Sequence, residues 1–315
     1  MYAMTILSPG PLSTVQDAGR FGYMSTGFSP GGAMDTKAAK TANLLVGNAP
    51  MDGVIEMTVM GLSAQFSCDT LVAITGADMA PELNGEAVPM YRAIPVHAGD
   101  TLTMKIAKSG MRAYLAVAGG FDLPMRMGSM STNLKCALGG MEGRKLQRGD
   151  VLPLRRALTS FPKETREASP ETYSKAFTVR VILGPQDDFF TEKGLETFLS
   201  SAYVVTDKSD RMGVRLDGEK IENKNGVDII SDGIATGSIQ IPASGTPIIM
   251  MADRQTTGGY AKIATVISAD LPKIAQAAPG TEIRFTAISP KDAVRILRKE
   301  ELKLKALEYR LLFKD

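Results

Sequence analysis

Four short polar stretches, each containing glycine, carry the side chains of this sequence that could do chemistry. They lie at residues 14–22, 118–132, 209–213 and 253–262. Glycine lets the chain turn sharply there, so acids, amides, hydroxyls and cations can gather at one place. Such a set permits a pocket that stabilises an anion, in which Asp or Tyr moves a proton and Arg or Lys offsets negative charge on a carbonyl or phosphoryl oxygen.

The first and third stretches each place a carboxylate beside a guanidinium. Residues 14–22 read TVQDAGRFG, and residues 209–213 read SDRMG. The planar guanidinium of Arg20 can grip a substrate carboxylate with two parallel hydrogen bonds. For this stretch alone, a turn in which Asp17 and Arg20 hold only each other is the simpler interpretation.

The second and fourth stretches supply hydroxyl and backbone donors. Residues 118–122 read AGGFD and residues 128–132 read GSMST. Together they offer hydroxyls and N–H groups to an anion, although such loops are commonly plain turns. Residues 253–262 read DRQTTGGYAK. A turn requires the glycines of that stretch but not the polar set around them, which favours a functional role.

Missing motifs argue against several classes of chemistry. His97 is the only histidine, and it stands before a turn-like Ala-Gly-Asp sequence with no nucleophile signature, which favours a surface residue over a catalytic one. The sequence has no HExxH, no GxxxxGK[ST] and no GxGxxG after a strand. Cys68 and Cys136 lack CxxC spacing, which argues against a disulfide framework and a zinc site. We therefore expect no metal site.

Composition indicates the surroundings in which the protein works. Its 36 basic and 34 acidic side chains leave a net charge of +2, too small to indicate nucleic-acid binding. The sequence has no apolar run of about 18 residues that would predict a membrane span, and the first ten residues lack the features of a signal peptide. Together with the two separate cysteines, these features predict a cytoplasmic protein that binds neither nucleic acid nor membrane.

The elements that must position the polar stretches are mostly strands. Short apolar or β-branched runs alternate with glycines, as at residues 71–75 and 113–117. A chain of 315 residues is long enough for two domains, and the polar residues 155–175, with two prolines and no strand pattern, mark the junction. We predict a mainly β protein with domains at residues 1–160 and 176–315.

Helices are expected to be few. Asp35 should cap a helix that stops at Gly47, and residues 192–200 should form another. Ser289 is a candidate cap for the last helix, with Pro290 at its first position and leucines forming an apolar stripe. We expect this last helix to pack on its own domain.

The two halves of the sequence also resemble each other. Residues 55–78 and 230–253 share the order strand, glycine, strand and terminal aspartate at a constant offset of 175 residues. Met34-Asp35 and Ser209-Asp210 are separated by the same offset. This agreement favours tandem copies of one β fold, and a site between two domains is geometrically natural.

The same motifs carry a resemblance to a known family. The chain resembles the biotin-dependent carboxyltransferase-like proteins, which include the C subunit of 5-oxoprolinase, the regulator KipA, allophanate hydrolase subunit 2 and the carboxyltransferase domain of urea carboxylase. The resemblance covers nearly the whole chain. It rests on TVQDAGRFGY from Thr14, GAMD and ANLLVGN from Gly32, the loop at residues 119–132, SDRMGVRLDG from Ser209, GSIQIP from Gly237 and DRQTTGGYAKIATVI from Asp253.

The resemblance implies two tandem cyclophilin-like β-barrel domains with a few short helices, and it leaves three functions open. The first is the C subunit of an ATP-dependent 5-oxoprolinase, which opens 5-oxoproline to glutamate together with the A and B subunits. The second is a KipA-like regulator that binds and antagonises a KipI-like kinase inhibitor. The third is a biotin-dependent carboxyltransferase acting on urea or a related amide, which would need a separate biotin carrier because the chain lacks an Ala-Met-Lys-Met sequence.

We favour the first function because metabolic subunits should outnumber regulators in such a family. Under it, the partners are the A subunit of 5-oxoprolinase together with its KipI-like B subunit, ATP acts through the complex, and the chain alone is inactive. Biotin is required only under the third function. One departure from the family pattern is Met130, which stands where the family usually has arginine in a Gly-Ser-Arg-Ser-Thr loop. If the family's arginine binds an anion, this chain has lost that contact, which bears on its activity or its substrate.

The residues and the resemblance together predict one site at a cleft between the halves. The expected catalytic residues are Asp17, Asp210, Asp253, Tyr260 and Lys262. The expected substrate-binding residues are Gln16, Arg20, Ser129, Ser131, Thr132, Arg211, Gln240, Gln255, Thr256, Thr257, Gly258 and Gly259.

Overall fold

The computed structural model describes residues 2–224 and 226–312. Strands hold 35% of the residues and helices 18%, which confirms the prediction of a mainly β protein. Contacts divide the chain into two compact units. Unit 1 comprises the chain up to Arg20, Gly31–Tyr173 and the chain from Leu302, and unit 2 comprises Phe21–Pro30 and Ser174–Glu301.

The division into units differs from the predicted one at two segments. Phe21–Pro30 groups with unit 2, where Met24 contacts Arg254. The end of the last helix groups with unit 1, because Leu304 and Leu307 pack against a core cluster of that unit. The expectation that the whole last helix packs on the C-terminal domain is therefore wrong for its final turns. The break after Tyr173 falls within the expected junction.

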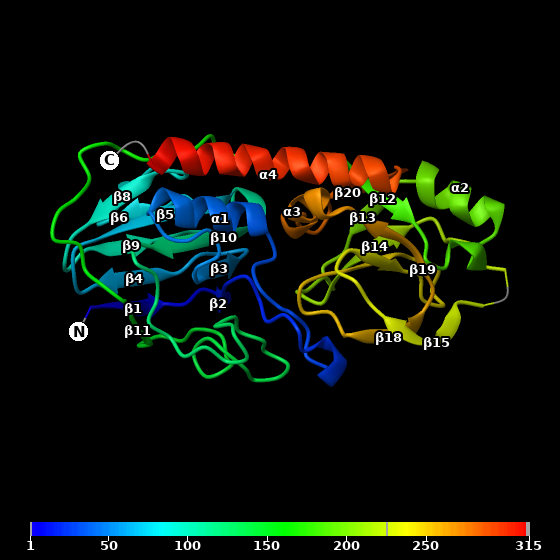
Figure 1. Cartoon of the computed structure of the whole chain (residues 1–315), viewed down its shortest axis with the longest axis horizontal. Coiled ribbons are helices and arrows are strands. Elements are labelled where there is room, and N and C mark those ends of the chain that lie inside the picture. Colours follow the sequence, from blue (N-terminus) through cyan, green and yellow to red (C-terminus); the bar gives the residue numbers. More distant parts are fainter. Residues whose placement is uncertain (1, 225, 313–315) are drawn as a thin grey trace. The chain divides into compact units, whose positions relative to one another are not determined.

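Unit 1 is built from two sheets, whose strands are labelled in Figure 1. The two sheets share one apolar core. Met4 and Ile6 of the first sheet and Val15 and Ile55 of the second belong to the same buried cluster. The six-stranded sheet has the order β11 (Val151–Pro153), β1 (Ala3–Ser8), β4 (Ser63–Phe66), β9 (Thr101–Thr103), β6 (Glu82–Leu83) and β7 (Glu86–Ala87). The five-stranded sheet has the order β2 (Leu12–Gln16), β3 (Val54–Thr58), β10 (Ser109–Val117), β5 (Thr70–Asp78) and β8 (Ala93–Val96).

Helix α1 (Thr36–Leu45) covers the other face of the five-stranded sheet. Its alanines join Tyr114 and Ala116 of β10 in a second buried cluster, whereas Leu115 faces the core between the sheets. This alternation is what a strand buried on both faces requires. The predicted cap is confirmed, since Asp35 Oδ1 accepts a hydrogen bond from the N–H of Ala38 at 2.9 Å.

Unit 2 contains a closed seven-stranded barrel. Its first and last strands pair in parallel, with Ala176 opposite Glu282 and Val181 opposite Ala287. The strand order is β12 (Ala176–Leu183), β19 (Lys262–Val266), β16 (Ser238–Gln240), β17 (Ile248–Met250), β14 (Gly213–Gly218), β13 (Tyr203–Val205) and β20 (Glu282–Ala287). The expected barrel thus closes in unit 2, whereas the strands of unit 1 form two separate sheets.

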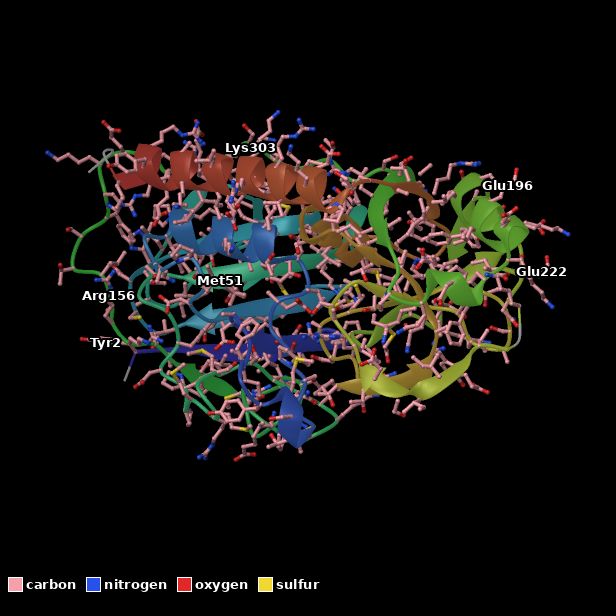
Figure 2. The ribbon with its side chains drawn as sticks, turned by 45° about the vertical axis from the view of Figure 1, so that its right-hand side comes forward. Tyr2, Met51, Arg156, Glu196, Glu222 and Lys303 are labelled. Carbon is pink, nitrogen blue, oxygen red and sulfur yellow. The ribbon has the colours of Figure 1, made fainter. Side chains whose placement is uncertain are left out.

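A two-stranded ribbon and several short helices complete unit 2. The ribbon pairs β15 (Asp228–Gly233) with β18 (Thr257–Tyr260). Helix α2 (Glu192–Ser200) confirms the prediction for that segment, and Figure 2 labels Glu196 within it. The remaining short elements are η1 (Met24–Thr26), η2 (Asp187–Phe189), η3 (Ser268–Asp270) and α3 (Leu271–Ala275).

The last helix, α4 (Pro290–Leu312), begins as the sequence predicts. The Oγ of Ser289 accepts a hydrogen bond from the N–H of Asp292 at 3.1 Å, and Pro290 takes the first helical position. Lys303, labelled in Figure 2, is exposed on this helix. None of the helices in the described parts of the chain combines the length and the apolar character needed to cross a bilayer.

The internal repeat is visible in the order of the strands but not in their pairing. Ser63 begins β4 and Ser238 begins β16, at the expected offset of 175 residues (238 − 63). However, β4 pairs with β1 and β9, whereas β16 pairs with β17 and β19. Asp35 caps a helix, whereas Asp210 precedes strand β14. Similar local patterns are therefore used in different sheets.

A buried carboxylate fixes the start of the barrel and gives the first testable prediction. Asp270 is fully buried and accepts two hydrogen bonds from the guanidinium of Arg180, at 2.6 and 2.8 Å, with Lys273 3.0 Å away. Burial by itself would raise the pKa of Asp270, but the hydrogen bonds from Arg180 and Lys273 lower it below its usual value.

Acid should therefore weaken unit 2 through Asp270. Because the folded pKa lies below the unfolded one, the stabilisation is fully present above the unfolded pKa of about 3.9 and is lost as the pH falls through the folded value. We expect Asp270→Asn to unfold more easily at pH 7, by about 2 kcal/mol, and to show a weaker acid dependence than the wild type. Urea titrations between pH 7 and pH 2 measure both. Equal acid dependence in the two proteins would contradict the assignment.

Candidate functional site

Asp17 follows strand β2 and holds the Ser129–Ser131 loop of unit 1 by its carboxylate. Its Oδ1 accepts hydrogen bonds from the hydroxyls of Ser129, at 2.6 Å, and Ser131. The N–H of Gly19 also donates to Oδ1, at 2.8 Å, and the N–H of Met130 donates to Oδ2, at 2.7 Å. Four donors thus satisfy a carboxylate that is 6% exposed. In this arrangement Asp17 fixes the loop.

Gln16 and Arg20, which were also predicted as site residues, hold the same loop by further hydrogen bonds. The amide of Gln16 donates to the carbonyl of Thr132 at 3.1 Å, and the guanidinium of Arg20 donates to the carbonyl of Ser131. Arg20 is 1% exposed, so its side chain is enclosed by protein and does not lie open to a ligand. A Cβ at Gly139 would stand 2.1 Å from the carbonyl oxygen of Ser131, which explains why a glycine closes over the loop.

Met130 reaches Asp17 through its backbone and the core through its side chain. The residue is 3% exposed and belongs to the apolar cluster between the two sheets. A Cβ at Gly53 would lie 2.3 Å from its sulfur, so the thioether occupies space that a glycine leaves open. The side chain at this position points into the core, and Met130 changes the packing there while leaving the loop tied to Asp17.

A buried acid that the sequence analysis did not single out fixes the GAMD motif. The Oε2 of Glu56 accepts hydrogen bonds from the N–H of Met34, at 2.8 Å, and from the hydroxyl of Tyr114, at 2.9 Å. The Tyr114 oxygen in turn accepts from the N–H of Asp35 at 2.7 Å. Burial, and next the charge of Glu56, raise the pKa of Tyr114 well above its usual value. The hydroxyl therefore stays protonated as a donor.

In unit 2, Arg211 and Asp253 form a bidentate ion pair. The guanidinium donates to the two carboxylate oxygens at 2.8 and 3.1 Å, and the N–H of Asp253 donates to the carbonyl of Arg211 at 2.9 Å. Both side chains are largely buried. Asp210 has a local role, since its Oδ1 accepts from the N–H groups of Met212 and Gly213. The pair joins the third and fourth polar stretches.

Lys262 places a buried ammonium at the end of the fourth stretch. The residue is 2% exposed, and its Nζ donates to Oδ2 of Asp232 at 2.7 Å and to the carbonyl of Gly233 at 3.2 Å. The hydrogen bond from Lys262, followed by one from the N–H of Gly233, lowers the pKa of Asp232. Two of the three ammonium hydrogens are used within the described part of the chain. The third can donate to a ligand oxygen.

The rest of the fourth stretch forms a partly open polar strand. A Cβ at Gly258 would lie 2.9 Å from the amide nitrogen of Gln240 and 3.5 Å from that of Gln255, so the two carboxamides closely surround this glycine and leave no room for a side chain. Gln240 also donates to the carbonyl of Tyr260 at 3.3 Å. Tyr260 is 41% exposed. The exposed or half-exposed residues beside them are Gln255, Thr256, Thr257 and Gly259.

The predicted site residues thus form two groups. The group in unit 1 is Gln16, Asp17, Arg20, Ser129, Ser131 and Thr132. The group in unit 2 is Asp210, Arg211, Gln240, Asp253, Gln255, Thr256, Thr257, Gly258, Gly259, Tyr260 and Lys262. Each group is gathered within its own unit, and the convergence of both on one cleft stays a prediction. The solvent-exposed donors belong to the group in unit 2, because all six residues of the group in unit 1 are buried.

A cavity of about 700 Å³ lies elsewhere in unit 1. Its walls include Tyr91, Tyr173 and Lys105, and the hydroxyls of the two tyrosines are 3.2 Å apart. None of the predicted site residues lines it. Cavity size therefore does not identify the site. Across residues 2–224 and 226–312, no three His, Cys, Asp or Glu side chains are arranged to hold a metal ion.

Three residues of these sites were missed from the sequence. Glu56 interrupts an apolar strand, VIEMT, and a charge at such a position signals a buried partner. Asp232 gave no signal, because its contact with Lys262 joins residues 30 positions apart. Arg254 stands inside the fourth stretch between two residues that were chosen, and only its burial in the structure distinguishes it.

Comparison with known proteins adds four similarities. A family model described as carboxyltransferase domain, subdomain A and B, matches residues 26–287. The C subunit of 5-oxoprolinase from Escherichia coli strain K12 is 37% identical over 309 residues, which cover 98% of each chain. That of Haemophilus influenzae is 39% identical over 305 residues, 95% of this chain and 96% of the other. The crystal structure of Kluyveromyces lactis urea carboxylase matches with a TM-score of 0.90 and 30% identity, over 97% of this chain but 29% of that one.

Proposed function

This chain belongs to the carboxyltransferase family of subdomains A and B, and on that premise we propose that it is the C subunit of an ATP-dependent 5-oxoprolinase. The observation that carries the proposal is the extent of the match. The chain matches the two bacterial 5-oxoprolinase proteins over almost their whole lengths. In urea carboxylase, the corresponding region is less than a third of a longer chain. A separate subunit suits an enzyme assembled from several proteins.

The proposed reaction adds water across the lactam C–N bond of 5-oxoproline and yields glutamate. Negative charge then develops on the lactam oxygen, and a donor fixed in advance stabilises it. Lys262 is such a donor, because Asp232 and a carbonyl hold its ammonium while one hydrogen stays available. Tyr260 offers an exposed hydroxyl that can hand a proton to the departing ring nitrogen. The Arg211–Asp253 pair keeps the neighbouring loops in place.

The proposal includes partners and a nucleotide. We expect the A subunit of 5-oxoprolinase together with its KipI-like B subunit to complete the enzyme, because the two relatives are named as one subunit of several. ATP would enter through the complex, since the sequence contains no P-loop or dinucleotide motif. The proposed site uses lysine, arginine, tyrosine and amide groups and needs no metal ligand. The cytoplasm is the proposed location.

The purified chain alone should release no glutamate from 5-oxoproline with ATP and magnesium. Glutamate should appear once the A and KipI-like B subunits are added, with one ATP consumed for each lactam opened. Enzymatic detection of glutamate in both mixtures is the measurement. The control omits the chain from the full mixture and should be inactive. Release by the chain alone would refute the dependence on partners, and an inactive full set would refute the function.

A second candidate function is carboxyl transfer, favoured by the match to urea carboxylase over almost the whole of this chain. Both reactions polarise an amide-like carbonyl, so the same lysine would serve. This function requires a biotin carrier besides these 315 residues, because they contain no Ala-Met-Lys-Met sequence. Carboxylation of urea by the chain with a carboxylated carrier, and no glutamate release, would favour the transferase.

A further inference from the structure

Arg254 is a buried cation of unit 2 with no carboxylate beside it. The residue is 4% exposed. Its Nε donates to the carbonyl of Ile234 at 2.8 Å, and Nη1 lies 3.4 Å from the carbonyl of Met251. Its Nη2 faces the sulfur of Met24 at 3.9 Å. Among the residues that the structure describes, Arg254 makes no ion pair with an acid.

Such a charge is unusual, because buried charges are normally paired. Two other buried charges of unit 2 follow that rule: Arg211 pairs with Asp253, and Asp270 pairs with Arg180. A guanidinium does not escape the cost by losing its proton. Burial lowers the pKa of Arg254, and no neighbouring acid offsets the effect. No carboxylate among the described residues therefore compensates this charge.

Ile234 links Arg254 to a glycine that is closely surrounded by amide donors. Ile234, whose carbonyl accepts from Arg254, also approaches Gly258, where a Cβ would stand 2.6 Å from its Cδ1. The amide nitrogens of Gln240 and Gln255 border the same glycine, at 2.9 and 3.5 Å from that Cβ position. A planar guanidinium and carboxamide N–H groups are the kinds of donor that bind an anion.

The cover over Arg254 is weakly attached. A thioether sulfur is a poor hydrogen-bond acceptor, so Met24 gives the guanidinium little stabilisation. Met24 lies in Phe21–Pro30, where the carbonyl of Tyr23 accepts from the N–H groups of Thr26 and Phe28, so that turn is held by local bonds. Phe21 is 69% exposed. Moving the Met24 side chain aside therefore breaks its weak contact with Arg254 but none of these backbone hydrogen bonds.

We propose that Arg254 is the receptor for a small carboxylate, which binds its guanidinium when Met24 moves aside. The ligand chemistry is a carboxylate on a compact molecule, held by two parallel N–H···O bonds from the guanidinium. For the identity of the ligand, 5-oxoproline, this inference rests on the proposed function. It assigns to Arg254 the task that the sequence suggested for Arg20, which donates to a backbone carbonyl instead.

Thermal unfolding of the purified chain tests the receptor without requiring turnover. Saturating 5-oxoproline should raise the midpoint of the wild type by about 5 °C, whereas 2-pyrrolidinone, the same ring without the carboxylate, should not. Arg254→Met should abolish the shift. Without ligand, that variant should melt at or above the wild-type temperature, because an unpaired buried charge is removed. The matched control is Arg215→Met, an exposed arginine of the same unit, which should keep the shift.

Several results would overturn the receptor. One is a 5-oxoproline shift that survives in Arg254→Met. Another is a marked loss of stability in that variant without ligand, as expected if Arg254 merely supports the carbonyls of Ile234 and Met251. A shift given by inorganic phosphate but not by 5-oxoproline would replace the carboxylate with a phosphate. No shift in either the chain or its assembled complex would also refute the proposal.

A second variant guards against misfolding of the first. Met24→Ala removes most of the side chain that covers Arg254. It should lower the Kd for 5-oxoproline several-fold, because less free energy is spent on displacing that side chain when the ligand binds. An unchanged or raised Kd contradicts the role of Met24.

The proposed function and the receptor can be refuted independently of each other. Binding that depends on Arg254 in a complex that releases no glutamate would sink only the proposed function. Glutamate release with wild-type KM in Arg254→Met would sink only the receptor.

Discussion

Replacing Lys262 with methionine is expected to lower kcat/KM of the assembled 5-oxoprolinase by about 100-fold to 1000-fold. Methionine keeps the length and the apolar stem of the side chain but removes the only donor of this position that can meet charge on the lactam oxygen. Because the ammonium is fixed by Asp232 and Gly233, it needs no reorganisation when that charge develops. The measurement is initial-rate kinetics with saturating ATP and saturating partner proteins.

Two readouts separate this role from a structural one. Lys193→Met, at an exposed position of α2, is the matched control and should leave kcat/KM unchanged. Removing the Lys262 hydrogen bond should also let the pKa of Asp232 rise toward its usual value, which NMR titration of the chain alone detects. A variant with a raised Asp232 pKa, an intact fold and wild-type turnover would exclude Lys262 from the chemistry.

Asp17→Ala should lower the free energy of unfolding by about 3 to 5 kcal/mol. The variant leaves two serine hydroxyls and two N–H groups without their acceptor in a place where Ser129 and Ser131 are fully buried. Each orphaned donor adds a desolvation penalty, so the sum is large for a single substitution. Urea unfolding, extrapolated to water, gives the difference.

The control for this variant is Asp122→Ala, which removes an exposed carboxylate from the same unit and should change stability by less than about 0.5 kcal/mol. A loss below about 1 kcal/mol in Asp17→Ala would mean that the loop does not depend on the carboxylate. If stability drops as expected, any loss of activity in Asp17 variants must first be corrected for unfolding before a proton-transfer role is considered.

Local features were readable from the sequence because they depend on neighbouring residues. The caps at Asp35 and Ser289, the helix at residues 192–200 and the buried strands follow from spacing within a few positions. The polar stretches were also found correctly as places where side chains gather. What they do there could not be read, because Asp17 meets its loop more than a hundred positions away (129 − 17 = 112).

The other features that the sequence left open also depend on residues that are distant in the chain. Whether strands close into a barrel or form two sheets depends on which distant strands pair and in what register. The pattern of apolar residues within each strand does not determine this. Arg211 and Arg254 look alike in the sequence, each next to an aspartate, yet one has a carboxylate partner and the other has carbonyls and a sulfur. Only the distribution of buried charge tells them apart, and that is a property of the folded chain.

The parallel seam of the barrel has a consequence for synthesis on the ribosome. Ala176 of β12 pairs with Glu282 of β20, which is made 106 residues later (282 − 176). At translation rates of about 5 to 20 residues per second, β12 waits about 5 to 20 seconds for its partner. Its other neighbour, β19, is also made late, so both edges of β12 are unpaired for most of that time and the cylinder stays open. Unit 2 therefore completes its fold late in translation, and its exposed edge is then a natural target for chaperones.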